Sequence, residues 1–244
     1  MPETRKADPA LSPVLQPLGS NIWTSDGSLV SVAGFRYPTR MAIIRLADGS
    51  LFIWSPVEAD EALHEAVSAL GAVKVLVAPN SLHHLALAAW KAKHPDARLL
   101  AAPGLRKRRP DLAFDGDLTE SADPAWASEL DQAVVHGNAI TTEVVFFHRQ
   151  SSTVLFTDLI QNFPKGWFKG WRGLVASLDR LVAPDAEVPQ KFRVAFTDRR
   201  AAREALVRIL AWPIETVVMA HGPVVRGRGH AYITRAFRWL MKGR

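Results

Sequence analysis

The order of strand and helix patterns along the chain constrains its fold more than any single motif does. Short β-rich segments come first, then strand–helix units, more strands, helical stretches, one last strand and a terminal helix. Regular alternation would predict a doubly wound sheet or a barrel, and this order is not regular. We therefore expect two sheets packed against each other, with helices on their outer faces.

Turn residues and apolar runs place the strands. Asp48-Gly49 separates the apolar stretches 41–46 and 50–54, and this dipeptide favours a tight hairpin turn. Asp26-Gly27 predicts a similar turn ahead of a strand over 28–35. Further strands are expected at 73–78, 98–102, 133–135, 143–148, 153–157 and 216–220. The run 73–78 is β-branched and aliphatic throughout, which is typical of a buried strand.

Apolar residues at helical spacing place the helices. One helix is expected to begin with Pro56 in its first turn, with its apolar face formed by residues up to position 70 and its end at Gly71. Further helices are expected over 83–94, 172–181, 198–210 and 230–241.

The composition sets the domain organisation. With 244 residues and 48% hydrophobic content, the chain is long enough for one large domain. Four prolines in 1–18 indicate a flexible N-terminal arm, and we expect a single domain over 19–244. The first residues lack the apolar core of a signal peptide, and no apolar run approaches the roughly 20 residues of a membrane span. We therefore expect a cytoplasmic protein. The absence of cysteine excludes disulfides, thiolate ligands and cysteine nucleophiles.

Polar side chains follow three of the predicted strands. Asn80, His83 and His84 follow the first, Asp158 the second and His221 the last. Imidazole nitrogens with one carboxylate suit zinc, with iron or manganese as alternatives. A more ordinary explanation stays open for each: a lone histidine after a strand is commonly a cap or a packed core residue, and an aspartate can cap a helix.

A charged residue in the neighbouring strand is a further candidate. Glu143 and His148 lie in the predicted strand 143–148 and differ by an odd number, so only one of them can face the site. Glu143 is the better candidate for a general base or an extra ligand. A solvated strand carboxylate is the alternative.

Aromatic and basic residues gather directly after Asp158. The segment 163–172 contains two tryptophans, two phenylalanines, two lysines and an arginine, with glycines that allow movement. Indole rings and cations bind anionic or aromatic groups, so Lys165, Trp167 and Trp171 are candidate substrate contacts on a lid. The alternative is a packed loop whose rings cover an open edge of the core.

The basic C-terminal segment is a third candidate for a functional surface. The chain carries a formal net charge of +6, and arginines alternate with apolar residues over 226–244. Such a helix can lie on a membrane or on nucleic acid, but more often it packs its apolar face on its own domain. We expect a small-molecule ligand and no nucleic-acid partner.

Several motifs carry a family resemblance. They are Arg40-Met41, Ala78-Pro79-Asn80 followed by His83-His84, the segment 162–168, and Ala220-His221-Gly222. From about Gly19 onward the chain resembles the metallo-β-lactamase superfamily, and more closely a family of unknown function assigned to it. Leu155-Phe156-Thr157-Asp158 resembles the superfamily's Leu-Phe-Thr-Gly-Asp segment without its glycine. The resemblance implies a four-layered αββα sandwich.

The departures from the superfamily limit the site. Its His-x-His-x-Asp-His signature, aligned with His84 as the last member, meets Pro79, Ser81 and His83 at its first three named positions. A further histidine ligand is expected near Ala139, where His136 is out of register. The resemblance therefore implies no two-metal site and leaves one metal position.

The residues of that one position are His83, His84, His221 and Asp158, with Asp158 also orienting the reacting groups. The expected function is a diverged hydrolase with at most one metal ion and a small substrate, using Glu143 as base and Asn80 among its substrate contacts. The alternative is a non-catalytic member whose cleft holds a ligand or supports the structure, with no metal.

Overall fold

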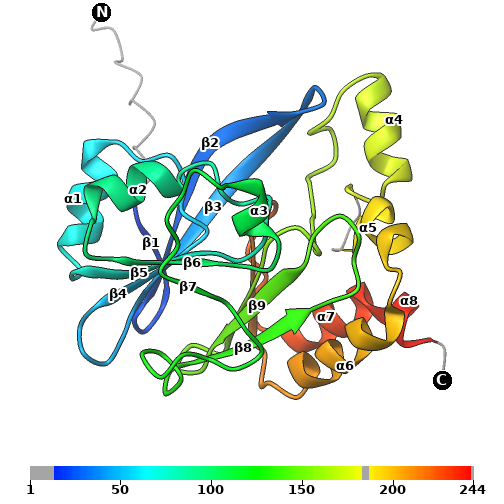
Figure 1. Cartoon of the computed structure of the whole chain (residues 1–244). Coiled ribbons are helices and arrows are strands. Elements are labelled where there is room, and N and C mark those ends of the chain that lie inside the picture. The colour runs from blue at the N-terminus through cyan, green and yellow to red at the C-terminus, as the bar shows by residue number, and fades with distance from the viewer. Residues whose placement is uncertain (1–13, 183–186, 243–244) are drawn as a thin grey trace, which may run out of the picture.

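The computed structural model describes residues 14–182 and 187–242, and within them two β-sheets lie at the centre (Figure 1). The first sheet has seven strands in chain order: β1 (Gln16–Gly19), β2 (Ile22–Val32), β3 (Phe35–Arg45), β4 (Leu51–Trp54), β5 (Val73–Ala78), β6 (Arg98–Ala101) and β7 (Gly116–Asp117). β1 to β4 pair antiparallel, and β4 to β7 pair parallel. Of the predicted arm, 1–13 lie outside the described residues and 16–18 belong to β1.

The second sheet has four described strands in the order β11-β10-β9-β8. Their bounds are β8 (Leu130–Val135), β9 (Glu143–His148), β10 (Thr153–Phe156) and β11 (Thr216–Met219). β8, β9 and β10 pair antiparallel, whereas β10 and β11 run parallel. β10 and β11 therefore end at the same edge of the sheet.

The helices lie outside the two sheets. They are α1 (Glu61–Ser68), α2 (Leu87–Lys93), α3 (Leu105–Arg108), α4 (Trp171–Leu178), α5 (Gln190–Ala195), α6 (Arg199–Leu210), α7 (Gly229–Ala236) and α8 (Arg238–Met241). In Figure 1, α1 and α2 cover the first sheet, and α6, α7 and α8 cover the second.

Alternating side chains divide the core into three layers. Phe52 of the first sheet and Phe146 of the second belong to the cluster between the sheets. The next residue in each strand points to the opposite face, because side chains alternate along a strand. Thus Ile53 packs toward α1 and α2, and Phe147 packs toward α5, α6 and α7. The predicted αββα sandwich is confirmed.

One predicted turn is wrong. β2 continues through Asp26-Gly27 with a register shift, and the chain reverses at Ala33-Gly34. Ala33 and Gly34 have φ values of 49° and 78°, which suits a two-residue turn with both residues left-handed. Gly27 is needed for a close approach instead, since a Cβ there would lie 2.5 Å from atoms of Thr39 and Val57.

Two helices begin later in the structure than the sequence predicts. The helix predicted from 83 begins only at Leu87, so His83 and His84 lie in the loop after β5. The helix predicted with Pro56 in its first turn begins only at Glu61, and the side chain of the capping residue Asp60 accepts the backbone N–H of Leu63 at 2.9 Å.

The basic C-terminal segment packs on its own domain. Ile233, Phe237 and Leu240 are almost fully buried in the core cluster on the outer face of the second sheet. No helix in the described ranges is long and apolar enough to cross a bilayer.

Candidate metal centre

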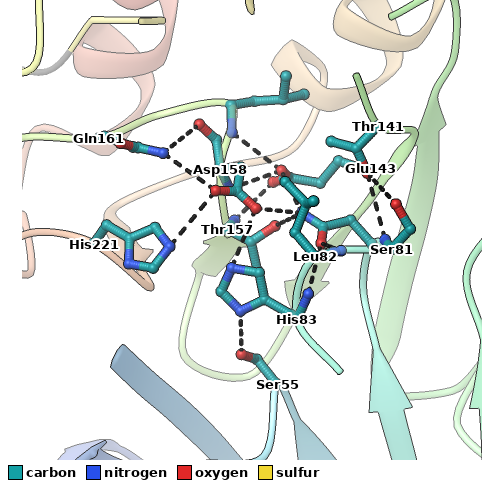
Figure 2. A network of polar contacts seen from close by, with 12 residues as sticks. Ser55, Ser81, Leu82, His83, Thr141, Glu143, Thr157, Asp158, Gln161 and His221 are labelled. Atoms are coloured by element: carbon teal, nitrogen blue, oxygen red, sulfur yellow. Dashed lines mark hydrogen bonds and ion pairs between the residues drawn. The ribbon is translucent and has the colours of Figure 1, made fainter. Parts of the chain in front are cut away.

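Two pairs of parallel strands bring the candidate residues together. β4 and β5 are parallel, so Ser55 and the segment from Asn80 to His83 follow them at one edge of the first sheet. β10 and β11 are parallel, so Asp158 and His221 follow them at one edge of the second sheet. Figure 2 shows the side chains of His83, Asp158 and His221 converging.

His83, Asp158 and His221 form a compact group. Their nearest potential ligand atoms all lie within 4.8 Å of one another. His83 Nε2 lies 3.2 Å from Asp158 Oδ2, and His221 Nε2 lies 3.6 Å from Asp158 Oδ1. All three side chains are 9% exposed, so the group is largely shielded from water but reachable.

Asp158 is held in the ionised form. Burial raises the pKa of its carboxyl, but the neighbouring His83 and His221 rings outweigh burial and bring the pKa well below its usual value. The side-chain amide of Asn80 donates to Oδ2 at 2.7 Å, and that of Gln161 donates to Oδ1 at 3.2 Å. The carboxylate is therefore a fixed negative charge at the centre of the group.

The outer nitrogen of each histidine ring is engaged elsewhere. His221 Nδ1 lies 2.6 Å from the carbonyl oxygen of Pro38, and His83 Nδ1 lies 2.8 Å from Ser55 Oγ. A carbonyl only accepts, so His221 Nδ1 must carry the hydrogen. Such contacts to the second ring nitrogen are usual for metal-binding histidines, because they fix the ring's orientation.

This arrangement fits a cation. A neutral His221 ring with its hydrogen on Nδ1 has no hydrogen on Nε2. Its Nε2 and the Asp158 carboxylate would then be two acceptors facing each other. A proton or a metal ion between them relieves this. Beside them, the Gln161 Oε1 atom is buried without a hydrogen-bond partner among the described residues. Two imidazoles and one carboxylate form the three-ligand set typical of a catalytic zinc site with an open position.

Glu143 faces the site but holds the loop instead of reaching into it. Its fully buried carboxylate accepts the backbone N–H groups of Thr157, Asp158 and Leu159 at 2.7, 2.9 and 3.1 Å. Burial and the charge of Asp158 raise the pKa of Glu143, while the bonds from Thr157 and Asp158 oppose that rise. Both Glu143 oxygens are thus engaged in holding the backbone of this loop, and the general-base role expected of Glu143 stays a prediction.

His148 lies at the other end of β9 and, because side chains alternate along a strand, on the opposite face from Glu143. It pairs with Thr153 in the sheet, and its Nδ1 lies 2.7 Å from Ser151 Oγ.

Asn80 also has a structural role. It is fully buried, its oxygen accepts the N–H groups of Leu82 and His83, and its amide donates to Asp158 and Thr157. In this structure Asn80 bridges the two strand-end loops, and the substrate contact expected of it stays a prediction.

His84 does not join the group. Its ring lies among the cations at the end of α3, 3.1 Å from Nε of Arg108 and 3.3 Å from an Arg109 nitrogen. Burial and these two arginines lower the pKa of His84. The two adjacent histidines therefore point in different directions, His83 toward Asp158 and His84 toward the arginines. Of the two adjacent histidines, the structure brings only His83 into the group with Asp158 and His221.

The aromatic loop lies beside the site. Phe163 contacts Tyr37 at a ring distance of 5.7 Å, and Tyr37 contacts His221 at 5.6 Å. Trp167 packs on Phe163 and donates its ring N–H to the carbonyl of Arg36 at 2.9 Å. The loop is thus held against β3, and the substrate contacts proposed for it stay predictions.

The other two candidates of this loop are exposed. Trp171 packs edge-on against Phe35, and Lys165 faces solvent. Neither belongs to the three-residue group.

Residues that the sequence reasoning missed complete the surroundings. Arg40 Nη1 donates to the carbonyls of Met219 and Gly222, on either side of His221, while its Nε pairs with Asp26 at 2.7 Å. The Arg40-Met41 motif was the signal that could have found it. Ser55 carried no such signal, because its partner His83 is distant in sequence. Gln161 bonds to the nearby Asp158, but no motif marked that contact.

A family model described as a domain of unknown function, DUF4336, matches residues 20–169, which is more than half of the chain. The chain belongs to the DUF4336 family. This DUF4336 member has no match among curated proteins.

The fold of this DUF4336 member is that of metallo-β-lactamases. It is similar to the metallo-beta-lactamase from Pontibacter korlensis, with 14% identity, 93% and 98% of the two chains covered and a TM-score of 0.62. It is also similar to FIM-1 from Pseudomonas aeruginosa in its mono-zinc form, with 13% identity, 97% and 98% coverage and a TM-score of 0.61. A third such enzyme, from Hirschia baltica, gives 12% identity, 93% and 96% coverage and a TM-score of 0.62. At these identities the likeness concerns the fold.

Proposed function

We propose that this DUF4336 member is a hydrolase that binds one divalent metal ion through His83, Asp158 and His221 and acts on a small molecule. The observation that carries the proposal is the convergence of His83, Asp158 and His221, whose potential ligand atoms all lie within 4.8 Å of one another. Zinc is the ion that best suits two imidazoles and one carboxylate, with iron and manganese as alternatives. Solved neighbours of the same fold are metallo-β-lactamases, one of them in a mono-zinc form.

When bound, such an ion supplies Lewis acidity that polarises a carbonyl or phosphoryl oxygen and acidifies water. The chain's own residues provide the frame. Ser55 and Pro38 fix the two histidine rings, and Glu143 holds the backbone that presents Asp158. Asp158 balances the positive charge and orients the group. We propose that Lys165 and Trp167, on the loop beside the site, contact the substrate.

The test compares loaded and stripped protein. Purified protein is treated with chelator, reloaded with zinc, iron or manganese, and assayed on a panel of β-lactams, thioesters, carboxylic esters and phosphodiesters. We expect hydrolysis of at least one class that disappears on stripping, returns on reloading and is lost in Asp158→Asn. Hydrolysis that survives stripping and this substitution would contradict the proposal.

A second candidate function also has an observation in its favour. The Asp158 carboxylate already accepts hydrogen bonds from Asn80 and Gln161 and contacts both histidines, so the network can be complete without a metal. On this basis the second proposal is that the protein binds a ligand at this site without catalysing a reaction. Metal content separates the two candidates.

A further inference from the structure

Helix α4 turns an apolar stripe outward. Trp171, Leu174, Val175 and Leu178 are 61%, 66%, 42% and 71% exposed, and their spacing places them on one face of the helix. Ala176 is the buried residue of this helix. In Figure 1, α4 stands at the upper right, away from the helices that cover the sheets. A helix normally turns such an apolar stripe toward its own core, so an exposed stripe indicates an interaction surface.

Cations flank the stripe. Lys165 and Lys169 lie in the loop that leads into α4, and neither forms an ion pair with any residue of 14–182 or 187–242. At the other end of the helix, Asp179 lies 3.8 Å from Lys191, and Glu187 is paired with Arg180 and Arg193. The surface is therefore apolar and basic together. We call Lys165, Lys169, Trp171, Leu174, Val175 and Leu178 the α4 patch.

The patch has a firm base. The Trp171 ring packs edge-on against Phe35 at 5.8 Å, and Phe168, just before the helix, packs against Phe35 at 5.4 Å. Phe163, Phe168 and Ala176 form a small core cluster of their own, with Phe35 packed against it. The exposed side chains are thus presented by a packed substructure and are available without refolding.

We propose that the α4 patch binds the surface of an anionic lipid membrane. A helix with an apolar face and flanking cations lies in the interface, where its apolar side chains enter the headgroup region and its lysines meet lipid phosphates. Tryptophan is enriched at that depth. The charge argues against a second copy of this chain as the occupant, because a two-fold contact through the patch would bring its unpaired lysines toward their own copies.

The test is co-sedimentation of the full chain with vesicles of phosphatidylcholine alone or with about a third phosphatidylserine. We expect binding to the anionic vesicles that weakens as salt is raised, and little binding to the neutral ones. The exposed double substitution Leu174→Gln/Leu178→Gln should lower the partition coefficient about tenfold or more. Lys165→Gln/Lys169→Gln should weaken binding to anionic vesicles specifically.

Matched controls come from other helices. Val194 on α5 is 70% exposed, and Lys107 lies exposed on α3, so Val194→Gln and Lys107→Gln should leave binding unchanged. Binding that is absent from anionic vesicles, or equally reduced by the control variants, would overturn the proposal. A concentration-dependent dimer that Leu174→Gln/Leu178→Gln abolishes would overturn it in favour of a second copy.

Discussion

The buried Glu143 carboxylate accepts the backbone N–H of Asp158 at 2.9 Å and fixes the loop that carries this central candidate ligand. The two acids thus have different tasks, although β9, which begins at Glu143, and β10, which precedes Asp158, are paired neighbours in the sheet. Asp158 presents its charge to two histidines, and Glu143 satisfies the backbone donors beneath it.

This relationship predicts the effect of Glu143→Gln. The side-chain NH2 group of the new glutamine would face backbone N–H groups. Two hydrogen-bond donors would then meet where the Glu143 carboxylate now accepts a charge-assisted hydrogen bond. We expect the free energy of unfolding to fall by about 2–4 kcal/mol. Urea denaturation measures the change, and Glu204→Gln on exposed α6 is the control, with a change below about 0.5 kcal/mol. Equal, small effects in the two variants would show that Glu143 does not hold the loop.

Asn80→Asp tests the amide bridge. The substitution keeps the oxygen that accepts the N–H groups of Leu82 and His83 and replaces the amide that donates to Asp158 with a second acidic oxygen. Two buried acceptors would then face each other, and we expect a loss of about 3 kcal/mol at pH 7. Unfolding measured across pH should show the loss shrinking in acid, as the new carboxyl becomes protonated. Unchanged stability at neutral pH would argue against the bridge.

Arg40→Met removes the guanidinium that joins the carbonyls on both sides of His221. Because the residue acts through the position of His221, we expect the folded variant to bind zinc at least about tenfold more weakly, which is about 1.4 kcal/mol. Calorimetric titration measures the affinity. Arg45→Met, which removes an exposed arginine bonded to Asn21, is the control and should bind as the parent does. Equal affinity in the two variants would contradict this role.

His64 gives stability a dependence on pH. Burial, assisted by the charge of Lys93, lowers the pKa of His64, with Glu61 and Asp60 opposing, and the ring packs on Trp90 and His94. The unfolded chain therefore binds the proton more readily, so the contribution of His64 to stability is present above about pH 6.5 and is lost as pH falls toward the folded-state pKa. His64→Gln should make the fall in unfolding free energy below pH 6.5 shallower. An unchanged slope would contradict this expectation.

The fold was predictable because local signals agreed with the global order. Asp48-Gly49 set one hairpin, the aliphatic run over 73–78 set a buried strand, and the irregular succession of elements excluded simple alternation. Asp26-Gly27 misled because its glycine allows a close approach of Thr39 and Val57 instead of forming a turn. The neighbouring residues in the sequence do not distinguish a glycine needed for a turn from one needed for a close approach.

The site was predictable only in part. Strand ends pointed to His83, Asp158 and His221, because rigid strands converge at their carboxyl ends. The direction of His84 depends on where the following helix begins, four residues later than its pattern suggests. The task of Asn80 depends on partners far along the chain, which spacing does not reveal.

The central claim is a single metal ion on His83, Asp158 and His221. Elemental analysis of untagged protein, purified without chelator and soaked in zinc, iron or manganese before desalting, tests it most directly. We expect about one equivalent of metal in the parent and in His84→Ala, and almost none in His83→Ala or His221→Ala that fold normally by circular dichroism. No bound metal in the parent, or metal that His84→Ala alone removes, would contradict the claim.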